Sequence, residues 1–423
     1  MDGPAGEIRA GLFVSGDNDG MSEFDFETPI DRLTPPIDDS IKWGRYARHH
    51  ARGQDVLPMW IADMDFSAPP AVIEALETRV QHGVFGYPHP TPAVRDAVLL
   101  HLERDLGWSV EADWLVWLPG LVTGLNLACR AVGDAGDAVL TAVPIYPPFM
   151  SAPTLSHRQL LTIPLVHQHG QWAWDFDALE ALAVSPEGQR IRLLMLCNPH
   201  NPVDCVWDRE TLIRLGQLAE RHDWLICSDD IHAELVLEPG CRYTPLASLS
   251  PALAQRTITL LAPSKTYNIP GLGASFAVIP DPVLRRRFEA VMNGIVPHIN
   301  VLGYTAMAAA YRHGVPWRDA LQTYLRQNRD RLVEAVNDIP GLQMDSPEAT
   351  YLAWIDASGL ALPAGQSAAR FFEAAGLGLS AGEDFMPGAT QYVRLNFACP
   401  RTTLEEAIRR LGAACAPCAA NHG

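Results

Sequence analysis

The chain has 423 residues, of which 48% are hydrophobic and 19% charged, and its mean hydropathy is 0.00. This length exceeds one ordinary hydrophobic core, so we expect a globular protein of two domains. The formal net charge of -17 disfavours nucleic acid and anionic membranes as partners, and no apolar run approaches the roughly 20 residues of a membrane span. Residues 1–27 lack the basic and apolar regions of an export signal, which favours a cytoplasmic protein that binds small molecules or other proteins.

Strand-like and helical patterns alternate along the chain, as is typical of a mostly parallel α/β sheet. An acidic extension over residues 1–27, expected to be disordered, leads into an irregular Pro-rich stretch and then a helix from Pro70 to about His82. Further along, Arg209–His222 has the apolar spacing of an amphipathic helix. Six short β-rich runs are predicted to be strands: Trp114–Leu118, Ala138–Val143, Arg192–Cys197, Trp224–Ser228, Thr257–Leu261 and Ala274–Ile279. Long helices are expected over Asp281–Ala309, followed by helix, strand and a last helix that ends near Gly412.

Only two lysines, Lys42 and Lys265, occur among the 32 Lys and Arg residues. Arginine carries the basic charge elsewhere, so a retained lysine suggests a need for an amine that can lose its proton and attack a carbonyl. Lys265 lies in the run Pro263–Asn268, directly after a predicted strand. It is therefore a candidate for a Schiff base with a carbonyl cofactor.

Distinctive polar groups follow five of the predicted strands. In an open parallel sheet, ligands bind beyond the carboxyl ends of the strands. The first of these strands opens into Pro119–Gly124 and then a helix, which offers free backbone N–H groups to a phosphate. The other four are followed by Tyr146, Asn201, Asp229 and Lys265.

These residue types match the chemical needs of pyridoxal phosphate. Its aldehyde requires an amine (Lys265), and its ring nitrogen requires a carboxylate to stay protonated (Asp229). Its phenolate oxygen requires a donor (Asn201), and its flat ring favours an aromatic neighbour (Tyr146). Taken singly, Asp229 could be a helix N-cap, Asn201 a turn residue and Tyr146 a core aromatic. Their joint occurrence in this order favours a cofactor site.

Six runs within Ile41–Leu411 repeat the motifs of a known enzyme family. They are Trp60–Phe66, Asn198–Val203, Ser228–His232, Pro263–Asn268, Thr350–Asp356 and Val393–Pro400. With them the chain resembles the fold-type I pyridoxal-phosphate enzymes of the class I/II aminotransferase superfamily, and most closely the cystathionine β-lyase-like (MalY/PatB-type) C–S lyase branch. The resemblance implies an α/β fold with a large, mostly parallel sheet and a smaller α/β domain built from the N- and C-terminal segments.

The resemblance also implies a role for each residue around the ring of the cofactor. Lys265 would carry the cofactor and act as the general base, and Asp229 would pair with the pyridine nitrogen. Asn201 would donate to the phenolate oxygen. Tyr146 would stack on the ring, with His232 close by.

Binding of the phosphate and of the substrate is implied in the same way. Val122 and Thr123 would give backbone amides to the phosphate, with Ser264 assisting. Tyr87 would reach the phosphate of the other subunit, so the active unit would be a homodimer with its sites at the interface. Arg394 would bind the substrate α-carboxylate with two hydrogen bonds, a geometry that suits Arg better than Lys; alone, it could also be an ordinary strand cation.

With this fold, we expect a large cofactor-binding domain over residues 76–300. Residues 28–75 and 301–412 would form the small domain, and residues 413–423 a flexible tail. Cys415 and Cys418 lie on this tail with the spacing of a redox pair or half a zinc site. No second pair or histidine completes such a site, so no metal is predicted.

The chain departs from the family pattern at several positions. Asp204 and Cys205 stand where Gly and a basic residue are usual, Asp230 replaces Glu, and Ala262 replaces a hydroxyl residue. The run Ser380–Phe385, near the expected substrate entrance, is more acidic than usual. These departures leave the substrate open and fit a specialised biosynthetic enzyme as well as a housekeeping one.

We therefore expect β-elimination from an S-substituted L-cysteine or a cystathionine-like amino acid, giving a thiol, pyruvate and ammonia. An aminotransferase would use the same residues but would need a keto-acid acceptor, and an oxidative or decarboxylating variant stays open. A non-catalytic regulatory protein on this fold is disfavoured by the intact set of Lys265, Asp229 and Arg394.

Overall fold

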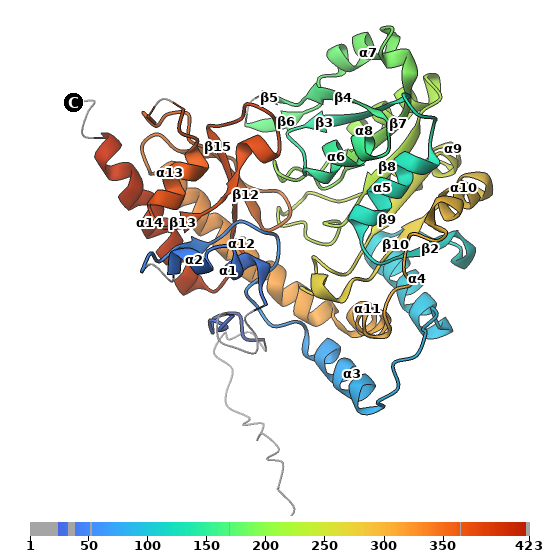
Figure 1. The fold of residues 1–423 in the computed structure, drawn as a ribbon, viewed down its shortest axis with the longest axis horizontal. Coiled ribbons are helices and arrows are strands. Elements are labelled where there is room, and N and C mark those ends of the chain that lie inside the picture. Colours follow the sequence, from blue (N-terminus) through green and yellow to red (C-terminus); the bar gives the residue numbers. More distant parts are fainter. Residues whose placement is uncertain (1–23, 33–38, 51–52, 169, 364, 420–423) are drawn as a thin grey trace, which may run out of the picture.

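A seven-stranded sheet forms the centre of the fold in the computed structural model, which describes residues 24–32, 39–50, 53–168, 170–363 and 365–419 (Figure 1). In spatial order its strands are β2 (Leu115–Leu118), β10 (Ser275–Val278), β9 (Thr257–Leu261), β8 (Leu225–Asp229), β7 (Ile191–Cys197), β3 (Ala138–Val143) and β4 (Gln159–Pro164). Only β10 runs against its neighbours, and every other pair in the sheet is parallel. The carboxyl ends of the other six strands therefore meet at one edge.

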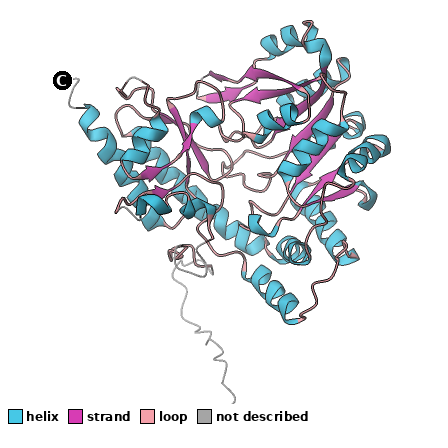
Figure 2. Ribbon diagram, viewed as in Figure 1, coloured by secondary structure: helices cyan, strands magenta, loops and turns pink. Residues whose placement is uncertain are grey.

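Helices cover both faces of this sheet (Figure 2). Successive strand residues point to opposite faces, so Val139 and Val143 of β3 enter one buried apolar cluster, whereas Leu140 and Ala142 enter another. The first cluster includes residues of α5 (Leu121–Ala131), α6 (Pro148–Leu155) and α10 (Pro282–Met292). The second includes residues of α7 (Phe176–Val184), α8 (Arg209–Arg221) and α9 (Pro251–Gln255). Burial on both faces explains why these strands are continuous apolar runs.

A second, four-stranded sheet is built from the C-terminal part of the chain, and a separate pair of short strands joins the N-terminal part to it. Its order is β11 (Gln343–Met344), β12 (Leu352–Asp356), β15 (Tyr392–Asn396) and β14 (Ser380–Ala381). Nearby, β1 (Leu57–Pro58) pairs in parallel with β13 (Leu377–Gly378). The long helix α12 (Val315–Asn337) packs against α14 (Arg401–Ala419), and α13 (Ala368–Ala374) contacts β13 and β15.

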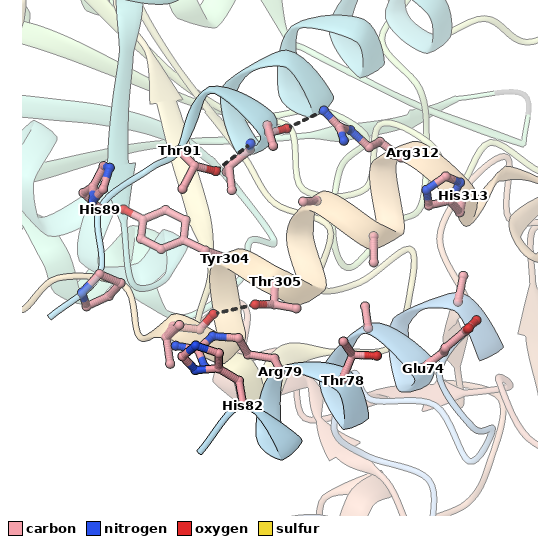
Figure 3. Close-up of a pocket in the computed structure, with 18 residues that line it drawn as sticks. Glu74, Thr78, Arg79, His82, His89, Thr91, Tyr304, Thr305, Arg312 and His313 are labelled. Carbon is pink, nitrogen blue, oxygen red and sulfur yellow. Dashed lines mark hydrogen bonds between the residues drawn. The ribbon is translucent and has the colours of Figure 1, made fainter. Parts of the chain in front are cut away.

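Three further helices pack together: α11 (Val301–His313) contacts both α3 (Pro70–Gln81) and α4 (Pro92–Leu106). A wide groove of about 1000 Å³ runs between them (Figure 3). Its walls are mostly apolar, with Arg79, His89, Tyr304 and Arg312 among the polar or aromatic side chains. Within the described part of the chain, no helix combines the length and apolar character needed to cross a membrane.

The six predicted strands are confirmed to within one residue at each end, as are the helices that begin at Pro70 and Arg209. β4 and the hairpin of β5 (Val166–Gln168) and β6 (Gln171–Ala173) were not predicted from the sequence. β4 is a partly exposed edge strand, so it lacks the continuous apolar run that marks the central strands.

Other expectations need correction. The stretch before Pro70 contains two short helices, α1 (Ile41–Gly44) and α2 (Ala47–His50); the Ser40 side chain accepts from Trp43 N and caps the first. The helices expected over Asp281–Ala309 are separated by residues 293–300.

The two ends of the chain are also more ordered than expected where the structure describes them. The extension over residues 1–27 lies outside the described residues as far as residue 23, but Phe26 is buried against Phe66. The last helix, α14, continues past Gly412 to Ala419, because Leu411 and Cys415 extend its buried apolar face. The Cys418 side chain lies outside the described residues.

The packing of Phe26 generates a first prediction. Its ring centroid lies 5.6 Å from that of Trp317 and 5.5 Å from that of Tyr324, and the side chain is 3% exposed. Phe26→Ala should lower the free energy of unfolding in urea by about 3 kcal/mol, because it leaves a cavity among these rings. Ile30→Ala is the matched control, since Ile30 is 40% exposed. Equal effects of the two changes would contradict a docked N-terminal segment.

Candidate active site

A buried cavity of about 320 Å³ lies at the carboxyl edge of the large sheet. The sheet order reverses between β3, which pairs with β4 on one side, and β7, which leads to β8 and β9 on the other. Such a reversal opens a crevice for ligands. The cavity brings together all but one of the predicted site residues: Val122, Thr123, Tyr146, Asn201, Asp229, His232, Ser264, Lys265 and Arg394.

The start of α5 forms one wall of the cavity. Gly120 stands at the N-cap and provides no side-chain cap, so the first N–H groups of the helix, those of Leu121, Val122 and Thr123, stay available. The positive end of the helix dipole and these amides together suit a phosphate. Ser264 lines the same cavity and supplies a hydroxyl.

Lys265 follows β9, and its amine donates a hydrogen bond to the Ala62 carbonyl oxygen. Burial lowers the pKa of Lys265 to about 8, against the opposing effect of the Asp63 carboxylate, while the nearby Arg394 charge lowers it further. A large share of the amine is therefore neutral at slightly alkaline pH. A neutral amine is the form that attacks an aldehyde.

Asp229 ends β8 and is almost fully buried. Burial raises its pKa to about 7, whereas a hydrogen bond from Ile231 N and the charge of Lys265 act in the opposite direction. A carboxylate in this position gains from a cationic partner. Asp229 can therefore hold a protonated ring nitrogen.

Asn201 and Arg394 are joined directly: Arg394 Nη1 donates to Asn201 Oδ1 at 2.8 Å. Because this bond occupies the amide oxygen, Nδ2 of Asn201 is the end left to donate to a ligand. Arg394 Nη2 donates to the Trp60 carbonyl oxygen at 2.9 Å. Burial lowers the pKa of Arg394 to about 10, so the guanidinium remains a cation at neutral pH and can bind a carboxylate.

Tyr146 and His232 complete the wall around the expected ring. Tyr146 N donates to the Asn201 carbonyl oxygen, which holds the aromatic residue beside the amide. Burial lowers the pKa of His232 to about 3, and the charges of Lys265 and Arg394 lower it further, so the imidazole is neutral. His232 Nδ1 is buried and has no hydrogen-bond partner among the residues that the structure describes, which leaves it available to a bound molecule.

Several contributors to the site were not predicted from the sequence. The backbone carbonyls of Trp60 and Ala62 accept from Arg394 and Lys265, and Tyr351 Oη also donates to Ala62 O at 3.0 Å. Phe385 lies under the guanidinium of Arg394, with its ring centroid 4.6 Å from Cζ. The Trp60–Phe66 motif contributes to the family resemblance, but a backbone carbonyl leaves no signal in side-chain chemistry.

The departures from the family pattern have local explanations. Asp204 has a φ of 58°, in the left-handed region that favours glycine, which Asp adopts more readily than most residues. Asp230 is buried and accepts hydrogen bonds from Ser228 Oγ and Tyr243 Oη. Glu383 and Asp384 are exposed and do not line the cavity.

Tyr87 and Lys42 lie outside the cavity. Tyr87 is 100% exposed on the segment between α3 and α4. Lys42 is 1% exposed, and its amine lies 2.6 Å from Asp65 Oδ2, so the second lysine is part of a buried ion pair that Arg32 shares through Asp65 Oδ1.

The arrangement in the cavity fits pyridoxal phosphate. An amine, a buried carboxylate, an amide donor, an aromatic ring and an open helix N-terminus face one buried space. Each answers a different part of that cofactor.

Comparison with known proteins agrees with this geometry. Residues 54–411 match the family model for aminotransferases of class I and II. Cystathionine beta-lyase PatB of Bacillus subtilis (strain 168) is 39% identical over 378 residues, which cover 89% of this chain and 96% of that protein. The crystal structure of OvoB has 48% sequence identity and a TM-score of 0.86, covering 92% of this chain and 98% of that one. Cystalysin from Treponema denticola, whose crystal structure contains a pyridoxal 5'-phosphate cofactor, has 30% identity and a TM-score of 0.86 over the same shares of the two chains. The chain belongs to the aminotransferase class I and II family, with the fold-type I architecture.

Proposed function

We propose that this protein is a pyridoxal-phosphate-dependent carbon–sulfur lyase that converts an S-substituted L-cysteine or a cystathionine-like amino acid to a thiol, pyruvate and ammonia. The observation that carries the proposal is the convergence of Lys265, Asp229 and Arg394 on one buried cavity. Relatives with the same fold and 30–39% identity are named cystathionine beta-lyase or cystalysin. A cytoplasmic location stays a prediction.

The cofactor, held through Lys265, supplies an electron sink for the charge that develops at the substrate Cα. Asp229 would keep its ring nitrogen protonated, and Asn201 Nδ2 would donate to its phenolate oxygen. Arg394 orients the substrate by its α-carboxylate, so that the Cα–H bond faces the amine of Lys265. With a pKa of about 8, Lys265 can take the Cα proton near neutral pH and later release it.

A homodimer is the assembly that we propose. Val84, Phe85 and Tyr87 are 60%, 57% and 100% exposed on one segment, an unusual concentration of apolar surface. Val122 and Ile295, at 44% and 66% exposed, line a shallow depression next to the expected phosphate site. In the proposed dimer, Tyr87 of one protomer reaches the phosphate that the α5 amides of its partner hold.

The titration of Lys265 gives a prediction about loading of the apoprotein. The rate of covalent loading with pyridoxal phosphate should rise about tenfold per pH unit up to about pH 8 and then level off, because only the neutral amine attacks the aldehyde. Stopped-flow absorbance of the bound chromophore measures this rate. Borohydride should then fix the cofactor to Lys265 and leave Lys42 unlabelled, as peptide mass spectrometry would show. A rate that still rises tenfold between pH 9 and 10 would mean that the amine has an unshifted pKa.

The proposed reaction is tested by product analysis. Wild-type enzyme given S-alkyl cysteines or cystathionine should release thiol and pyruvate over many turnovers without added keto acid. One turnover that resumes only when 2-oxoglutarate or pyruvate is supplied would favour the aminotransferase alternative.

Arg394 should be needed for that activity. Arg394→Ala should lower kcat/KM by about 100-fold or more, and Arg394→Lys should restore little of it, because an ammonium cannot make the paired contact. Binding of pyridoxal phosphate in Arg394→Lys should stay within about tenfold of wild type. Full activity in Arg394→Lys would show that the substrate carboxylate binds elsewhere.

The dimer is tested by subunit complementation. Tyr87→Ala should weaken the affinity for pyridoxal phosphate by about tenfold, and Lys265→Ala should abolish turnover. Refolding the two variants together at limiting cofactor should recover up to about a quarter of wild-type activity, because half of the sites in mixed dimers combine an intact Lys265 with an intact Tyr87 from the partner. Sedimentation analysis gives the assembly state. No recovery in mixed dimers would show that Tyr87 serves its own subunit or neither.

A further inference from the structure

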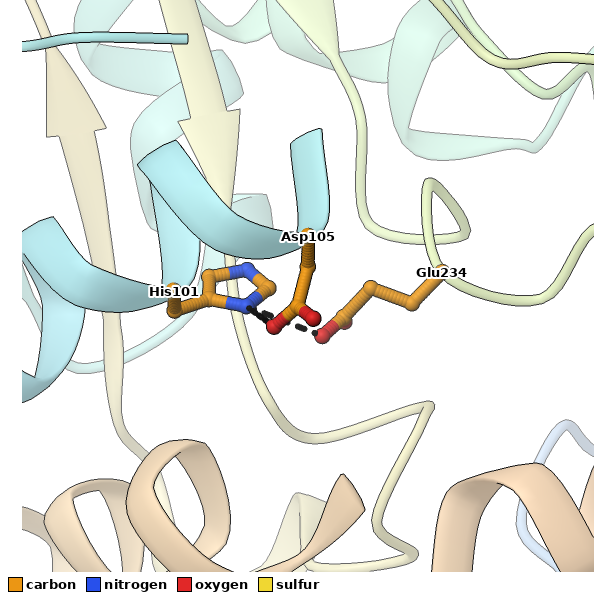
Figure 4. A group of neighbouring side chains, drawn as sticks. All are labelled: His101, Asp105 and Glu234. Atoms are coloured by element: carbon orange, nitrogen blue, oxygen red, sulfur yellow. Dashed lines mark hydrogen bonds and ion pairs between the residues drawn. The ribbon is translucent and has the colours of Figure 1, made fainter. Parts of the chain in front are cut away.

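A buried cluster of charged side chains lies outside the cavity and has no role in the proposed reaction. It consists of His101 and Asp105 on α4 and Glu234 on the segment after β8 (Figure 4). His101 Nδ1 lies 2.8 Å from Asp105 Oδ2 and 3.4 Å from Glu234 Oε1. The imidazole also stacks on Tyr311 of α11, with ring centroids 4.0 Å apart.

The ligand atoms of the cluster are as close together as those of a metal site, but cationic side chains already pair with one of its carboxylates. Its three ligand atoms lie within 4.8 Å of one another. However, guanidinium groups already pair with Asp105: Arg104 at 2.7 Å and Arg318 at 3.2 Å. Asp105 is thus already paired with two cations, and a divalent ion at the cluster would place further positive charge beside them. We therefore treat the cluster as an ion network of the protein itself.

Glu234 connects this network to the lysine. Its Oε2 accepts a hydrogen bond of 2.7 Å from Oγ1 of Thr266, the residue after Lys265, and both side chains are buried. The main chain around Glu234 is held by bonds from Ala233 N to Asp230 O and from Leu235 N to His232 O. Gln322 of α12 donates to the Glu234 carbonyl oxygen.

The bond therefore joins the two segments that carry the chemistry. Asp229 ends β8 and His232 lies on the segment that follows it, whereas Ser264 and Lys265 belong to the turn after β9. The other hydrogen bonds of that turn are local, such as Tyr267 N to Pro263 O, or lead to the Trp60–Phe66 segment through Lys265 and Asn268. The hydrogen bond between Thr266 and Glu234 therefore helps to fix the position of the Lys265 amine relative to the Asp229 carboxylate.

We propose that Glu234, which lies beside His101 and the Asp105 ion network, is a positioning residue that orients Thr266 and thereby fixes the place of the Lys265 amine. This inference rests on the proposed function, since it assigns Lys265 its role. Removal of the Thr266 hydroxyl would leave a buried carboxylate oxygen without its donor and free the turn to shift. A shift of about 1 Å at a reacting group can cost about 100-fold in rate.

Thr266→Val tests the tie with little change in volume. It should lower kcat by about 10- to 100-fold while KM changes less than about threefold, because the substrate contact of Arg394 is untouched. Thr266→Ser, which restores the hydroxyl, should recover kcat to within about threefold of wild type. The matched control is Thr259→Val on β9. The buried Thr259 hydroxyl has no hydrogen-bond partner within the described part of the chain, so this change should leave kcat unchanged.

A second readout does not depend on turnover. Bound pyridoxal phosphate in a fixed orientation gives a visible circular dichroism band, which should fall by about half or more in Thr266→Val and in Glu234→Gln but not in Thr266→Ser or Thr259→Val. This measurement stands even if the wild-type protein shows no lyase activity, so failure of the proposed reaction and failure of the tie can be told apart. A normal dichroism band in Thr266→Val, or a Thr266→Ser variant as impaired as Thr266→Val, would overturn the inference.

Discussion

The backbone of Trp60–Phe66 is the element on which the geometry of the site depends. Its carbonyl oxygens accept hydrogen bonds from the large sheet, through Lys265 and Asn268, and from the four-stranded sheet, through Arg394 and Asn396. A carbonyl can accept two hydrogen bonds without a side chain of its own, so one extended segment can hold both halves of the site. The groups proposed to bind cofactor and substrate are therefore held by the same segment, Trp60–Phe66.

Burial of these ionisable groups together determines their chemistry. Desolvation brings the pKa of Asp229 up to about 7 and that of Lys265 down to about 8, so the two groups lie close in proton affinity. A pyridinium placed beside Asp229 supplies the cation that its buried position favours. Lys265 is left as an amine that can exchange a proton near neutral pH. Arg394, with a pKa of about 10, stays charged and can bind a carboxylate.

The sequence supports prediction of side chains that stand at strand ends but not of contacts between distant segments. Asp229 and Lys265 follow apolar runs, and the carboxyl ends of parallel strands must meet at one edge. Glu234 carries no such signal, because its partner Thr266 becomes a neighbour only once the loops after β8 and β9 are folded. Ala62 acts through its backbone, and the role proposed for Tyr87 requires a second chain. The burial of Phe26 depends on rings that lie hundreds of residues away.

Asp204, whose backbone adopts the left-handed conformation, shows how the structure can accommodate a departure from the family pattern. Its carboxyl accepts a 2.6 Å hydrogen bond from Thr350, which has a φ of 69°. Asp204 follows the turn that carries Asn201, and Thr350 precedes β12, which pairs with the strand that carries Arg394. Unfavourable backbone conformations persist only where their surroundings compensate for them. Here the bond between Asp204 and Thr350 does so, and it also links the segments of Asn201 and Arg394 a second time, beside their direct hydrogen bond. The Asp204 side chain thus strengthens the contact between Asn201, on the proposed cofactor side of the cavity, and Arg394, on the proposed substrate side.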